Sequence, residues 1–146
     1  MTTHPVRISL HDITVIQFAT FPEVPFTGKV DHLRLKVDFE TVPSRHCITV
    51  IMRFQYEVTA GALVVLEFAV EYKIHEDNWK GFFQEDGALV IPLSLARHLS
   101  VIATGTGRGI LHEKLQSADR FRSLTWPIVD LTKIVVEDVR FDPVHQ

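Results

Sequence analysis

Apolar and polar residues alternate in three successive stretches between positions 33 and 74. The apolar face of the first stretch is formed by Leu33, Leu35, Val37 and Phe39. The second stretch alternates in the same way with Ile48, Val50, Met52, Phe54, Tyr56 and Val58, and the third with Val64, Leu66, Phe68, Val70, Tyr72 and Ile74. Successive side chains of a β-strand point to opposite faces, so this period of two predicts three strands of an antiparallel sheet with one apolar and one polar face.

A further strand is predicted before these three, over Val6 to Phe21, although its pattern is irregular. Ile8 and Leu10 share one face, but the parity of the apolar positions shifts across His11-Asp12. Such a shift indicates a β-bulge or a break. Because consecutive strands usually lie next to each other, the simplest arrangement of the four is a meander.

A long amphipathic helix is predicted from about Pro92 to Gln116. Proline is tolerated in the first helical turn, and the apolar residues that follow are spaced by three and four. Glycines at 105, 107 and 109 interrupt this helix and indicate a close approach to a neighbour or a kink. The final stretch, Asp130 to Phe141, fits either a short helix capped by Asp130 or a β-branched strand.

Between the sheet and the helix, residues 75–87 form a polar stretch that carries three large aromatic residues, Trp79, Phe82 and Phe83. The stretch is expected to leave the edge of the sheet. Two interpretations stay open for its aromatic side chains. They either anchor the stretch onto the apolar face of the sheet or form part of a binding surface.

The composition indicates one domain, residues 1–146, which is large enough to fold without a disulfide or a metal. The net charge is −3 and there is no long basic run, which argues against nucleic-acid binding. No apolar stretch reaches the roughly 18 residues of a membrane span, and the first residues do not form a signal region. The single cysteine, Cys47, cannot form an intramolecular disulfide, so a cytoplasmic location is expected.

No motif identifies an active site. The stretch Gly105 to Gly109 lacks the Lys-Ser/Thr of a phosphate loop and follows a helical pattern. His98 and His112 would lie about 21 Å apart along a helix, too far for one metal ion. A Ser-His-Asp triad assembles only in space, but no G-x-S-x-G motif is present. We expect no catalytic residue, metal or cofactor. An enzyme or a small-ligand binder is the minor alternative, and it predicts a deep pocket.

Three stretches of the chain resemble the SecB family of bacterial export chaperones. Residues 91–109 are similar to that family's helix, which opens with a proline or an aromatic residue, continues with Ala-Arg and ends with Arg-Gly. Residues 121–130 are similar to the following apolar segment, and residues 66–72 to a strand with apolar residues around Glu-Val. The chain departs from the family in its extra glycines and in Asp130, where the family has asparagine.

The resemblance implies an α+β fold in which a four-stranded antiparallel meander sheet is covered by a long C-terminal helix. It also implies a homotetramer, built as a dimer of dimers, that acts as a holdase and not as an enzyme. The implied clients are unfolded polypeptides, held in hydrophobic grooves for protein export or for protection of an antitoxin. The implied partners are therefore such clients, an export motor or an antitoxin. The alternative is an oligomer of this fold that has no client.

The residues expected to contact a client are aromatic. Trp79, Phe82 and Phe83 are predicted to line or gate a groove that binds polypeptides. Four further aromatic residues are predicted to form the core or the floor of that groove: Phe54, Tyr56, Phe68 and Tyr72.

Overall fold

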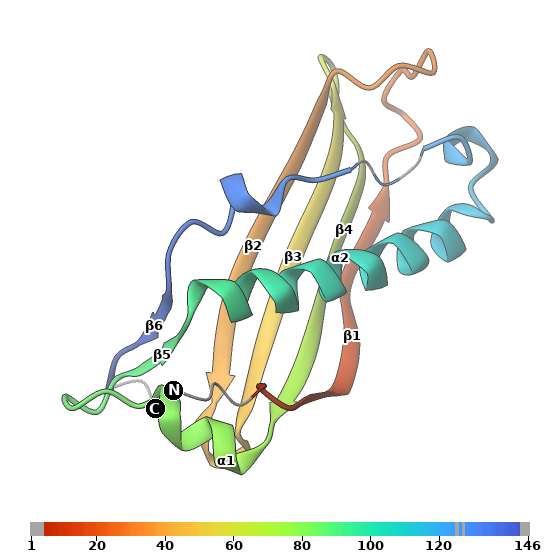
Figure 1. Ribbon diagram of the computed structural model, residues 1–146. Coiled ribbons are helices and arrows are strands. Elements are labelled where there is room, and N and C mark those ends of the chain that lie inside the picture. Colours follow the sequence, from red (N-terminus) through yellow and green to blue (C-terminus); the bar gives the residue numbers. More distant parts are fainter. Residues whose placement is uncertain (1–4, 125, 127, 144–146) are drawn as a thin grey trace.

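The structure is a computed structural model that describes residues 5–124, 126 and 128–143 (Figure 1). Its main elements are a four-stranded antiparallel sheet and one long helix that crosses a face of the sheet. The strands are β1 (Ile8–Thr20), β2 (His32–Val42), β3 (Cys47–Val58) and β4 (Gly61–Ile74), and the helix is α2 (Leu93–Leu115). The predicted α+β class is confirmed, and α2 agrees closely with the predicted range.

The strands lie in the order β1-β4-β3-β2. β2, β3 and β4 follow one another as a meander, as predicted. β1 lies beside β4 instead of β2, so the prediction of a four-stranded meander is wrong for this strand. The connection from β1 to β2 explains the difference. It contains Pro22 and Pro25, which lack backbone donors, and it is too long for a tight hairpin. β2 is thereby free to form the opposite edge of the sheet.

β1 pairs with β4 along its whole length, but the register shifts between Leu10 and Asp12 and again between Val15 and Gln17. The first shift confirms the bulge predicted at His11-Asp12. Each shift leaves one additional residue on β1, namely His11 and Ile16. These bulges decide which β1 side chains share a face with the core.

The core lies between the sheet and α2, and alternate residues of β3 and β4 supply most of it. α2 faces them with Leu95, Ala96, Leu99, Ala103 and Leu111, all buried. The hydroxyl of Tyr72 donates a buried hydrogen bond of 2.9 Å to the carbonyl of Leu99, which joins β4 to α2. Burial raises the pKa of this hydroxyl above its ordinary value.

Gly107 marks the closest approach of α2 to the sheet. A Cβ atom at this position would lie 2.6 Å from the ring of Phe68 and 2.8 Å from the ring of Trp126. Trp126 in turn stacks on Phe54, with ring centroids 4.0 Å apart. The glycines were predicted to mark either a close approach to a neighbour or a kink, and Gly107 marks a close approach. Gly105 and Gly109 face open space.

The remaining elements are short. The stretch after β4 contains α1 (Glu76–Trp79) and the 3-10 turn η2 (Lys80–Phe82), and β5 (Leu89–Ile91) pairs with β6 (Val139–Phe141). Two further 3-10 turns are η1 (Pro43–Arg45) and η3 (Asp119–Phe121). The ambiguous final segment contains both predicted structures, because the turn η4 (Leu131–Lys133) precedes β6. The carboxylate of Asp130 caps η4 by accepting a bond of 3.1 Å from the amide of Thr132.

Candidate functional site

β1 exposes apolar side chains on the face of the sheet that elsewhere forms the core. Leu10 lies opposite Tyr72 and Val15 opposite Phe68, and both of these β4 residues are fully buried. Opposed residues of antiparallel strands point to the same face. Yet Leu10, Ile13 and Val15 are 54%, 42% and 40% exposed. The apolar face of the sheet therefore continues beyond the part that the rest of the chain covers.

The two bulges create this arrangement. In a regular strand, Leu10 and Ile13 would point to opposite faces because they are separated by an odd number of positions. The additional residue at His11 restores Ile13 to the face of Leu10, and the additional residue at Ile16 does the same for Phe18. Ile16 is itself exposed. We call the exposed apolar residues of β1 the β1 patch: Leu10, Ile13, Val15 and Ile16.

The β1 patch stays exposed although α2 crosses the sheet and extends past β1, which forms an edge (Figure 1). The helix packs mainly against the two central strands, β3 and β4. Exposed apolar patches on a folded chain usually mark sites of contact with another molecule. An extended polypeptide is one molecule that this strand can accept.

The outer face of α2 carries a second set of exposed apolar side chains. Val101 and Ile102 point away from the buried positions of the helix and are exposed. Gly105, one turn further along, has open space where a side chain would be. Another chain can therefore approach the helix backbone closely at this point.

The aromatic residues predicted to form a groove are mostly inside the molecule. Trp79 is only 3% exposed, and its ring stacks on His46 with centroids 5.3 Å apart. Phe82 is also buried, whereas Phe83 is 39% exposed and meets Trp79 edge to face. Trp79 and Phe82 thus anchor the stretch after β4, and Phe83 alone of the three is open to a partner. The other predicted residues all lie in the core: Phe54, Tyr56, Phe68 and Tyr72.

Two features of the sequence point to the β1 patch, although the alternation of apolar and polar residues alone does not predict it. The N-terminal strand carries the large apolar residues Ile8, Leu10, Ile13, Val15, Ile16 and Phe18, and the shifted parity at His11-Asp12 marks a bulge. Bulges are common at sheet edges. An apolar strand with a bulge therefore points to an edge that carries an exposed surface, although the strand order decides which strand is its neighbour.

The opposite face of the sheet is polar and carries charges of both signs. Its acidic residues in the central strands are paired with arginines. The pairs are Arg34–Glu57 at 2.9 Å, Arg45–Glu71 at 3.1 Å and Arg53–Glu67 at 3.6 Å. This face therefore presents a mixed charge pattern and not an acidic surface.

The described residues were also searched for a metal site, a reactive thiol and a membrane-spanning helix. Across residues 5–124, 126 and 128–143, no cluster of three or more His, Cys, Asp or Glu side chains has the arrangement of a metal site. Burial, and then the neighbouring Glu71 carboxylate, raise the pKa of the Cys47 thiol, which disfavours the reactive thiolate. None of the helices in the described part of the chain has the length and hydropathy to span a membrane.

No family model and no curated protein matches this chain. Among solved structures, the chain is similar to a SecB-like chaperone of Mycobacterium tuberculosis in complex with a ChAD peptide from the HigA1 antitoxin. The two are 18% identical, and the match covers 84% of this chain and 91% of the chaperone, with a TM-score of 0.49. It is also similar to a protein of unknown function from Streptococcus agalactiae, at 9% identity, 86% and 100% coverage and a TM-score of 0.42.

Proposed function

We propose that this protein is a SecB-like holdase that binds unfolded polypeptides through exposed apolar side chains. The observation that carries the proposal is the β1 patch, which extends the apolar face of the sheet past its cover. The resemblance of residues 91–109 and 121–130 to the SecB family supports the same role. No catalytic chemistry is required for it.

The β1 patch suits clients of varied sequence. Burial of apolar surface stabilises a complex by about 25 cal/mol per Å² and does not depend on direction. Full burial of one large apolar side chain is worth about 1.5–3 kcal/mol, so each half-exposed residue of the patch offers roughly half of that. Association and ordering of the client oppose this gain. Several patch residues must therefore act together, which favours an extended client that runs along β1.

Self-association belongs to the same proposal. The outer edge of β1 carries backbone donors and acceptors with no neighbouring strand in the described sheet, and such edges pair readily with another chain. Val101 and Ile102 add apolar area on α2. A dimer or a tetramer would shield part of this surface and leave the remainder for clients.

The charge pattern of the polar face fits a protein that holds its client better than one that delivers the client to an export motor. The client would be an antitoxin segment or another unfolded chain. In the SecB family that the chain resembles, the export motor docks on acidic residues of the chaperone. Here Glu57, Glu67 and Glu71 are each paired with an arginine, which lowers the attraction that a basic partner would feel.

Two neighbouring residues of β1 allow a matched test. Val15 faces the core side of the sheet, and Thr14 faces the polar side opposite Ala69. Aggregation of a chemically denatured client after dilution is followed by light scattering. We expect the wild type to suppress aggregation, Val15→Asp to lose most of this effect and Thr14→Asp to retain it. Unchanged aggregation at a molar excess of the wild type would leave the alternative of an oligomer without a client.

A further inference from the structure

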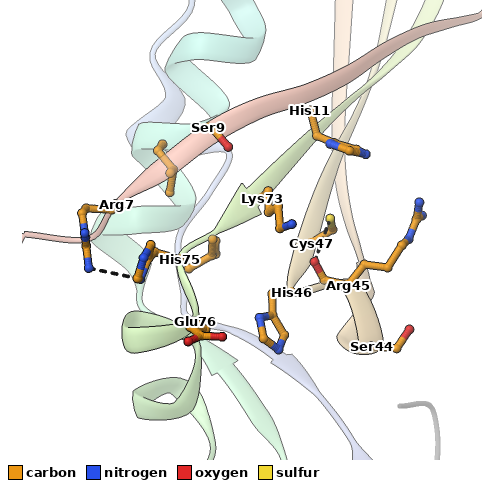
Figure 2. Close-up of a pocket in the computed structure, with 12 residues that line it drawn as sticks. Arg7, Ser9, His11, Ser44, Arg45, His46, Cys47, Lys73, His75 and Glu76 are labelled. Carbon is orange, nitrogen blue, oxygen red and sulfur yellow. Dashed lines mark hydrogen bonds between the residues drawn. The ribbon is translucent and has the colours of Figure 1, made fainter.

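A cavity of about 650 Å³ opens at one end of the sheet, where β1 begins, β4 ends and the turn between β2 and β3 passes (Figure 2). Basic residues and histidines dominate its polar lining: Arg7, Arg45, Lys73, His11, His46 and His75. We propose that this cavity binds a small oxyanion, a phosphate or a carboxylate group. Ser9 and His11 of the lining flank Leu10, but the lining contains no residue of the β1 patch, and the inference does not depend on the proposed chaperone function.

Lys73 is at the centre of the site. It lies on β4 between Ser9 of β1 and Cys47 of β3, on the polar face of the sheet. Figure 2 shows Arg7 and His75 to one side of Lys73, with Arg45 on the other side and His46 below it. The side chains thus come from three separate segments of the chain, residues 7–11, 44–47 and 73–76, and surround one hollow.

The arginines of the lining already have partners, whereas the lysine is available. Arg7 pairs with Asp77 at 2.9 Å, and Arg45 pairs with Glu71 at 3.1 Å. Lys73 is exposed, and no described carboxylate forms a salt bridge with it. Glu76 is the acidic residue of the lining and opposes the cations. An anion beside Lys73 would gain a charge-assisted hydrogen bond without breaking an existing ion pair.

Two irregularities of the backbone place histidines at this cavity. The first bulge of β1 leaves His11 without a residue opposite it on β4, and bulges commonly redirect side chains near functional sites. His46 has a φ of 54°, and it is the one non-glycine residue with a positive φ in the part of the chain that the structure describes. Such a conformation is uncommon and persists where the surroundings enforce it. The stack on Trp79 holds the His46 ring in place.

These groups match an anion better than a metal. An ammonium group and imidazole N–H groups are donors, and the Ser9 hydroxyl adds another. The described residues do not form a metal-binding cluster at this place or elsewhere. A volume of about 650 Å³ is also typical of small-molecule sites, so the cavity has room for the remainder of a molecule that carries the oxyanion.

The test is a titration of the ¹⁵N-labelled full chain, followed by the shifts of its amide NMR signals. One series uses sodium phosphate and a parallel series uses sodium acetate, both at constant ionic strength set with sodium chloride. We expect saturable shifts that are largest near Lys73, His46 and Cys47. The series that saturates at the lower concentration identifies whether phosphate or carboxylate is the preferred group.

Three variants make the result specific. Lys73→Met should weaken binding by about tenfold, because a hydrogen bond to a charged group is lost. His46→Gly should weaken binding and leave the fold intact, because glycine adopts a positive φ without strain. Lys36→Met is the control, since Lys36 is an exposed lysine on the same polar face outside this cavity. Shifts that stay linear with concentration, or wild-type affinity in Lys73→Met, would overturn the proposal.

Discussion

At the scale of single residues, the contact between α2 and the sheet depends on the absence of one side chain. Gly107 lies against Phe68 and Trp126, and both rings are held by further packing in the core. Gly105 and Gly109 occupy the same helix but face open space. The three glycines therefore look alike in the sequence, but substitution of Gly107 should affect stability in the opposite direction from substitution of Gly105 or Gly109.

Gly107→Ala should lower the free energy of unfolding by about 1–3 kcal/mol, because the added methyl group overpacks the contact with Phe68 and Trp126. Gly105→Ala and Gly109→Ala should each raise it by up to about 1 kcal/mol, because alanine is the better helix former. Urea unfolding followed by circular dichroism measures all three. Equal effects at the three positions would show that packing at Gly107 is not the deciding factor.

The alternation of residues 48–74 identified Phe54, Tyr56, Phe68 and Tyr72 as residues of one face, and the structure places them in the core. For Trp79, Phe82 and Phe83, the sequence left anchoring and binding open. A local pattern cannot separate these roles, since burial depends on segments far apart in the chain. The stack between His46 and Trp79 is one such contact.

At the scale of elements, the strands and the long helix were predictable because each is long and strongly periodic. The place of β1 in the sheet was not. Its apolar residues and its bulge are visible in the sequence, but the connection over residues 21–31 decides whether β1 lies beside β2 or β4. The β1 patch results from the position of β1 beside β4. The apolar residues of the patch could therefore be identified in the sequence, but their exposure could not be predicted from it.

The small sheet of β5 and β6 is fastened by a surface ion pair that should give stability a dependence on pH. The hydrogen bond with Arg140 holds the pKa of Asp86 below its ordinary value of 3.8. A carboxylate with a lowered pKa stabilises the fold above its unfolded pKa, and this contribution is lost as pH falls through the folded pKa. Asp86→Asn should therefore be less stable than the wild type at neutral pH.

This difference between the wild type and Asp86→Asn should shrink as the pH falls below about 4, because the wild-type carboxylate then becomes protonated. Thermal unfolding at a series of pH values measures the difference. Added salt should reduce it at neutral pH, because both side chains are exposed. A difference that is constant across the acid range would mean that ionisation of Asp86 beside Arg140 contributes nothing to stability.

At the scale of the whole molecule, the sheet has one apolar face, which α2 covers mainly over β3 and β4, and one polar face, while Leu10, Ile13 and Val15 of β1 stay exposed. A fold of this kind does not by itself determine a function. The proposed binding of clients depends on the β1 patch, and the cavity proposed to bind an oxyanion lies at one end of the opposite, polar face. The two sites can therefore be tested separately with variants that leave the other intact.

The most direct test of the central claim is amide hydrogen exchange along β1, measured with and without a chemically unfolded client at a fixed concentration of the protein. If the β1 patch binds extended polypeptides, the amides of residues 10–16 become protected when the client is added, and Val15→Asp abolishes this protection. Protection confined to other elements, or exchange in β1 that is unchanged by a saturating client, would contradict the account.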